Sequence, residues 1–211
     1  MRRRTRGWLG VAVAGVLAAG PAWAADTAGK MDKKLLQGVQ ALHAANEGEV
    51  QMGQMGVQMA TDPQVKAFAQ QMVDDHSKND QHLTTMAQSL GAPLTGKAYQ
   101  DKQKEGQKVM GKVHGKTGAD FDKEYMSLMV KDHAKDAKEV KTLANEARKT
   151  GRTDLASFLD TTEQTMQQHL AKAKGLEDGL KKSGGTAAAG ASGTGAGASD
   201  AGATGTSGSK K

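Results

Sequence analysis

Two five-residue motifs decide the fold: MVDDH at residues 72–76 and MVKDH at residues 129–133. Each lies in a run where apolar side chains recur every three or four residues, which is the spacing of an amphipathic α-helix. Each also places a histidine, His76 or His133, where such a helix presents an apolar side chain to its neighbours. The repeat therefore predicts two helical hairpins that pack together, with titratable groups on their inner faces.

The same periodicity continues on both sides of each motif. It predicts four long helices, over about residues 31–60, 63–90, 121–149 and from 153 to about 180. Asp62 and Pro63 give the second helix an N-cap and a proline at its first position, and Gly91 ends it. Asp120 and Thr153 are the predicted N-caps of the last two long helices.

A shorter pattern over residues 97–114 is polar and interrupted by glycine, and it predicts a short helix that crosses between the hairpins. Four long helices in two hairpins with such a crossover predict an all-α fold, a ferritin-like four-helix bundle. The first helix carries four glycines, which either weaken it or allow close helix contact: Gly38, Gly48, Gly53 and Gly56.

Both ends of the chain differ in composition from this region. Residues 1–24 combine arginines, a short apolar run and the sequence Ala22-Trp23-Ala24, which together predict a secretory signal peptide. Residues 183–211 are almost entirely Gly, Ala, Ser and Thr, which predicts a disordered tail. We therefore expect a single domain over residues 25–182, exported to the periplasm, the cell envelope or the exterior.

Charge and cysteine content exclude several classes of protein. The chain has 29 Lys+Arg and 23 Asp+Glu, but four of the arginines lie in residues 1–24, so the rest has 25 against 23, a net charge of +2. This balance and the few aromatic residues argue against nucleic acid as a partner. Without cysteine, disulfides and thiolate chemistry are excluded. No segment after residue 24 has the length and apolarity of a membrane span. An envelope or surface partner for the tail remains open, as does the oligomeric state.

Each long helix carries one titratable side chain on its apolar stripe: Glu49, His76, His133 and His169. Glu49 lies 13 residues before Asp62 and His76 lies 14 after it, so both are about 20 Å from that turn at the rise of an α-helix. The other two are each 18 residues from Gly151. The members of each pair therefore face each other across their hairpin.

Three imidazoles and a carboxylate that converge in a bundle suit Zn, Cu or Fe. In this hypothesis Asp75 and Asp132 are further ligands or accept hydrogen bonds that fix the histidine tautomers. His43 and His82 lie level with each other beside the stripe and are weaker, secondary candidates. The Glu-x-x-His signature of ferritin-type di-iron sites is absent, and no catalytic machinery is predicted.

The alternative interpretation is a structural or stress-related cell-envelope protein that binds no metal. The same side chains then form a buried polar network that sets the register of the helices, with His76 bound to Glu49 and His133 bound to His169 or a carboxylate. The two interpretations differ in whether mutation of the histidines abolishes metal binding or costs only stability.

The motifs also resemble a known family. FAxxMVxDH at residues 68–76, FDxxYxxxMVxDH at 121–133 and HLxxA at 169–173 are similar to the domain-of-unknown-function 4142 family, over about residues 33–177. The resemblance implies a bacterial envelope protein with a ferritin-like bundle and no established activity. Carried over by position, the polar residues characteristic of the family are Glu49, Asp75, His76, Asp132, His133 and His169.

Overall fold

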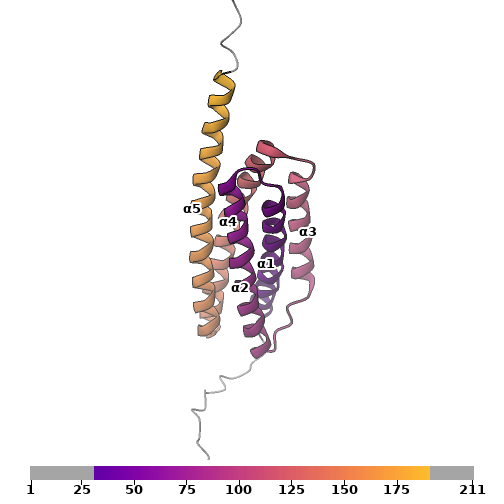
Figure 1. Ribbon diagram of the computed structural model, residues 1–211. Coiled ribbons are helices and arrows are strands. Elements are labelled where there is room, and N and C mark those ends of the chain that lie inside the picture. The colour runs from indigo at the N-terminus through magenta and orange to yellow at the C-terminus, as the bar shows by residue number, and fades with distance from the viewer. Residues whose placement is uncertain (1–30, 191–211) are drawn as a thin grey trace, which may run out of the picture. The chain divides into compact units, whose positions relative to one another are not determined.

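The computed structural model describes residues 31–190, with side chains as far as residue 183. Within this range the chain forms five helices and no strand (Figure 1). They are α1 (Lys33–Met59), α2 (Pro63–Ser89), α3 (Lys97–Val113), α4 (Gly118–Lys149) and α5 (Thr153–Gly190). The predicted all-helical class is confirmed. The predicted signal peptide lies outside the described residues. The predicted disordered tail begins at residue 183, but α5 continues to Gly190, so residues 183–190 are helical; the tail beyond Gly190 lies outside the described residues.

Consecutive helices form two hairpins. The most extensive contacts are those of α1 with α2 and of α4 with α5, and the hairpins meet where α1 packs on α4 and α2 on α5 (Figure 1). The shorter α3 packs mainly against α1, with a smaller contact to α4. Val113 is its one buried residue. None of the described helices is both long and apolar enough to cross a membrane.

The turns follow from local chemistry that the sequence partly predicts. Asp62 caps α2 by accepting from the backbone N–H groups of Gln64 (2.7 Å) and Val65 (3.2 Å). At the end of α2, Gly91 has a φ of 60°, which places it in the left-handed region that glycine favours. Its N–H bonds to the carbonyl of Gln88, and the next N–H bonds to Ala87, which completes a Schellman motif.

The predicted N-caps of the last two helices are wrong by a few residues. Thr117 is the N-cap of α4 and Asp120 lies in the first turn, because Gly118 adopts a φ of 58° and lets the helix begin earlier. Thr153 is the first residue of α5 and not its cap. Asp120 and Asp154 are both in first turns, where a negative charge stabilises the helix dipole.

A buried carboxylate of α4 ties the two hairpins together. Asp122 is only 2% exposed, and it accepts hydrogen bonds from Thr61 N (3.0 Å), Thr61 Oγ1 (2.6 Å) and Asp62 N (2.9 Å). These donors lie in the turn between α1 and α2, where the backbone N–H groups lack helical partners. The turn of one hairpin is therefore completed by a side chain of the other.

The apolar core is divided into two clusters along the four long helices. The Leu35 cluster includes Leu42, Leu83, Val140 and Leu159. The Phe68 cluster comprises mainly Met52, Val65, Phe68, Met72, Phe121, Tyr125, Met126 and Met129. On every long helix the chain passes from one cluster to the other through buried polar residues. The candidate site residues thus lie at the boundary between two apolar clusters.

Two of the glycines in α1 permit close contact with α2. A Cβ atom on Gly53 would lie 2.9 Å from the carbonyl oxygen of Ala69 and 2.8 Å from Cγ2 of Val73, both on α2. A Cβ on Gly56 would lie 2.6 Å from the Cβ of Ala69. Gly48, by contrast, would meet nothing within 4 Å. Close helix contact therefore explains Gly53 and Gly56, but not Gly48.

This difference gives a matched pair of variants. We expect Gly53→Ala to lower the free energy of unfolding by about 1–3 kcal/mol, because the added methyl group meets backbone that cannot move away. Gly48→Ala makes the same chemical change in the same helix without a clash, and we expect it to raise the free energy of unfolding by up to about 1 kcal/mol. Urea denaturation measures both. Equal effects of the two substitutions would contradict the proposed packing.

Candidate metal centre

Three histidines from three helices meet at the boundary between the two apolar clusters. His76 comes from α2, His133 from α4 and His169 from α5, and one ring nitrogen of each lies within 4.8 Å of the others. We call these three residues the histidine triad. The side chains are buried, with residue exposures of 4%, 1% and 1%. The two hairpins therefore dock so that their histidines share a level, which the sequence alone left open.

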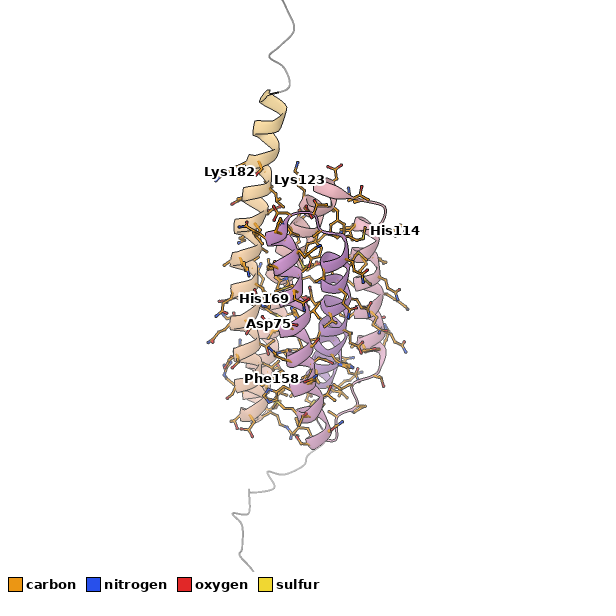
Figure 2. All side chains as sticks on the ribbon, viewed as in Figure 1. Asp75, His114, Lys123, Phe158, His169 and Lys182 are labelled. Atoms are coloured by element: carbon orange, nitrogen blue, oxygen red, sulfur yellow. The ribbon has the colours of Figure 1, made fainter. Side chains whose placement is uncertain are left out.

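Hydrogen bonds on the outer side of the triad determine two of its tautomers. Nδ1 of His133 lies 3.0 Å from the carbonyl oxygen of Met129, which can only accept, so this nitrogen carries the proton. Nε2 of His169 lies 3.0 Å from Oδ2 of Asp75 and donates to it (Figure 2). The remaining nitrogens, Nε2 of His133 and Nδ1 of His169, then carry lone pairs. Nδ1 of His169 is buried and has no hydrogen-bond partner among the described residues.

A chain of amides fixes the third tautomer. Nδ1 of His76 lies 3.0 Å from Oδ1 of Asn46. The orientation of that amide follows from its own bond to Oδ1 of Asn79 (2.9 Å), because Asn79 in turn donates to Thr162 Oγ1 (2.7 Å). Thr162 donates to the carbonyl of Phe158 (3.0 Å). His76 is therefore the donor to Asn46, and its Nε2 carries the lone pair.

The outer hydrogen bonds thus leave three nitrogen lone pairs inside the triad. Nε2 of His76 and Nε2 of His133 are 3.5 Å apart, yet two lone pairs cannot form a hydrogen bond with each other. The spacing suits a shared ion instead, since two nitrogens bound to tetrahedral Zn²⁺ at about 2.05 Å lie about 3.4 Å apart. A ring nitrogen of His169 lies within 4.8 Å of those of His76 and His133.

Burial keeps the triad neutral. Desolvation lowers the pKa of all three histidines, and the neighbouring imidazoles lower those of His76 and His133 further, so that His133 has a pKa of about 4. Burial opposes ionisation of Asp75, but hydrogen bonds from His169 and Gln71 outweigh it and lower the pKa of this carboxyl. At neutral pH the site thus holds neutral imidazoles beside one carboxylate, the protonation state that metal binding requires.

Two acidic residues that the sequence groups with the histidines lie elsewhere. Glu49 and Asp132 line a cavity of about 50 Å³ between α1, α3 and α4, together with Asp136 and Lys102. Burial first, then the charges of Asp136 and Asp132, raises the pKa of Glu49 well above its ordinary value, and Lys102 opposes this increase. Lys102 Nζ lies 2.8 Å from Oδ1 of Asp136. Within the described residues, neither Glu49 nor Asp132 belongs to the group whose ligand atoms converge.

The alternative pairing predicted from the sequence is not the one observed. His76 bonds to Asn46 and not to Glu49. His133 bonds to the carbonyl of Met129 and not to His169 or a carboxylate, and His169 bonds to Asp75 instead. Sequence analysis missed Asn46 although it lies four residues after the core residue Leu42 and so shares its stripe. The predicted site residues were chosen among charged residues and histidines, so the neutral amide of Asn46 was not among them.

The two secondary histidines occupy different environments. His43 bonds through Nδ1 to Oδ1 of Asp80 (2.7 Å), and its ring stacks on Tyr99 of α3 with centroids 5.4 Å apart. The hydroxyl of Tyr99 donates to Oε2 of Glu47 (2.6 Å). His82 instead packs edge-on against Phe158 of α5, with centroids 4.8 Å apart. Each therefore has its own contact, and His43 helps to hold α3 against α1.

Fold and site together define an all-helical protein in which one ring nitrogen of each of three buried histidines lies within 4.8 Å of the others. The chain belongs to the family described as Domain of unknown function (DUF4142), whose model matches residues 20–176. The resemblance seen in the sequence motifs is thereby confirmed. No curated protein and no solved structure matches the chain.

The depressed pKa of His133 predicts how stability depends on pH in metal-free protein. The pKa falls from 6.5 to about 4 on folding, so the neutral ring contributes fully above pH 6.5 and loses this contribution as the pH falls to 4. At about 1.4 kcal/mol per pH unit, the loss is about 3 kcal/mol.

The measurement is urea denaturation of wild type and His133→Gln between pH 7 and pH 4. The difference in unfolding free energy between the two proteins should decrease by about 3 kcal/mol across this range. Comparing two proteins removes the opposite contributions of Glu49 and Asp132, whose pKa values are raised by burial. His114→Gln, at an exposed histidine, is the control. A constant difference would contradict the buried neutral ring.

Proposed function

We propose that this protein binds one transition-metal ion through His76, His133 and His169. One observation carries the proposal: the outer hydrogen bonds use one nitrogen of each ring and leave a lone pair on the other, in a buried cluster where one nitrogen of each ring lies within 4.8 Å of the others. A buried polar atom without a partner destabilises the fold. A bound cation would satisfy the lone pairs of all three histidine nitrogens at once.

The ligand set favours a borderline metal. Neutral imidazole suits Zn²⁺, Cu²⁺ and Fe²⁺, whereas Mg²⁺ and Ca²⁺ prefer oxygen ligands. The bond from Asp75 to His169 is the carboxylate–histidine arrangement that orients a metal ligand and raises its basicity. Asn46 orients the ring of His76 in this way, and the carbonyl of Met129 orients the ring of His133. Glu49 and Asp132 are not part of this proposed ligand set.

Metal content of the purified protein tests the proposal. We expect wild type, stripped with chelator and reloaded without histidine tag, to retain about one equivalent of Zn²⁺, Cu²⁺ or Fe²⁺ by mass spectrometry. The His76→Ala/His133→Ala variant should retain none. His114→Ala removes an exposed histidine and should load like wild type.

Thermal unfolding of the same samples separates loss of ligands from loss of fold. The metal should raise the melting temperature of wild type and of His114→Ala but not that of the double variant, because only a folded site binds it. A wild-type protein that retains no metal after reloading contradicts the proposal. The triad would then be a structural polar network in an envelope protein.

We further propose that the four long helices form a ferritin-like four-helix bundle that works outside the cytoplasm. The contacts of α1 with α2 and of α4 with α5 support the bundle. The basic, apolar and small-residue segments of residues 1–24 support export.

Cleavage after the predicted signal peptide tests export. When the whole chain is expressed in a bacterial host, we expect the product in the periplasmic fraction to begin at Ala25. N-terminal sequencing and intact mass measure this directly. Replacing the arginines before residue 7 with acidic residues should retain the uncleaved chain inside the cell. An uncleaved wild-type chain in the cytoplasm would contradict the proposal.

A further inference from the structure

A groove between α2 and α5 leads to two members of the triad. These helices contact each other much less extensively than either contacts its hairpin partner, and the groove between them has a volume of about 670 Å³. His76 and His169 contribute to its wall, together with Asp75, Asn79, Thr161 and Thr165. His133 does not line it. Two of the three histidines of the triad therefore form part of the wall of this groove.

A row of hydroxyl groups follows one wall of this groove to the triad. Ser157, Thr161 and Thr165 are spaced by four residues along α5, and the next step of four is His169. Each hydroxyl donates its proton to the carbonyl one turn earlier, at 3.0–3.1 Å. Its oxygen can still accept hydrogen bonds from water. The groove is therefore polar enough to bring water to the edge of His169.

The charges around the triad determine which ligand fits. Three neutral histidines leave the two positive charges of a divalent ion uncompensated, and Asp75 is the one carboxylate bonded to the triad among the described residues. The exposed groove residues Lys78 and Asp154 carry opposite charges and offset each other. The charge of Lys172 acts on His169 as well, so the site keeps a net positive charge, which favours an anion. Since the triad residues are only 1–4% exposed, the ligand has to be a few atoms in size.

We propose that the metal centre keeps one coordination position open toward the α2–α5 groove, and that a small inorganic monoanion or hydroxide binds the metal there. This inference rests on the metal site proposed above. Three protein ligands with a fourth, exchangeable position distinguish metal sites that act on small molecules from closed structural sites. Water bound at such a position becomes a much stronger acid than free water.

Azide binding to the Co²⁺-loaded full chain tests the open position. Cobalt replaces zinc in such sites and absorbs visible light in a way that depends on its ligands. We expect a saturable change in the visible spectrum with one azide per cobalt. Bound cobalt with an unchanged spectrum overturns the open position but leaves the metal site intact. Absence of bound cobalt and of any other metal overturns both.

A pair of tryptophan substitutions tests the groove as the route. Thr165→Trp fills the groove next to His169, and we expect it to weaken azide binding about tenfold or more. Thr142→Trp makes the same change on α4, where the native hydroxyl also bonds one turn back, at 2.9 Å, and it should leave azide binding unchanged. Both variants should still bind one cobalt. Equal azide affinity in the two variants overturns the groove as the route.

Thr161→Trp, one helical turn farther from His169, keeps the test decisive if Thr165→Trp fails to fold. It should slow azide binding about tenfold in stopped-flow measurements while changing the final spectrum little, because it narrows the route without touching the metal. An unchanged rate in this variant also overturns the groove.

Discussion

The structure depends on the need to bury three imidazoles at one level without leaving their outer nitrogens unsatisfied. Each outer nitrogen has a partner at 3.0 Å, and two of the three partners come from a different helix than the ring. The hydrogen bond that His76 donates to Asn46 fixes α1 against α2, and the hydrogen bond that His169 donates to Asp75 fixes α2 against α5. A slip of one helical turn between these helices would leave several buried polar groups unpaired, each at a cost of about 1–3 kcal/mol.

The apolar residues cannot supply this specificity on their own. The Leu35 cluster and the Phe68 cluster consist mostly of aliphatic, methionine and aromatic side chains that tolerate rearrangement at similar volume. A polar layer between them distinguishes the native register from its neighbours, as a single buried asparagine does in coiled coils. Asp122 adds a second constraint, since it completes the α1–α2 turn from α4.

The sequence predicts helix extents and the histidine positions well because both follow from a period of 3.6 residues. The sequence could not show that Glu49 lies apart from the histidines, because the apolar stripe of one helix can contact two neighbouring helices at once. The structure shows the difference: α3 packs on α1, and Glu49 lines a cavity together with Lys102 of α3. Asp132 lines the same cavity, although it occupies the same position in its motif as Asp75. The two motifs therefore have different partners, because α3 packs against α4, which carries the second motif, and makes less contact with α2, which carries the first.

The two tyrosines in the described part of the chain sit in separate parts of the fold. Tyr99 stands on α3, where its hydroxyl bonds to Glu47, whereas Tyr125 is fully buried in the Phe68 cluster. Both tryptophans, Trp8 and Trp23, lie in residues 1–24, the predicted signal peptide. Because α3 has one buried residue, Val113, we expect it to unfold at a lower denaturant concentration than the four long helices. Ultraviolet absorbance and fluorescence of a chain without residues 1–24 would then show two optical transitions, with Tyr99 reporting the release of α3 and Tyr125 reporting loss of the core.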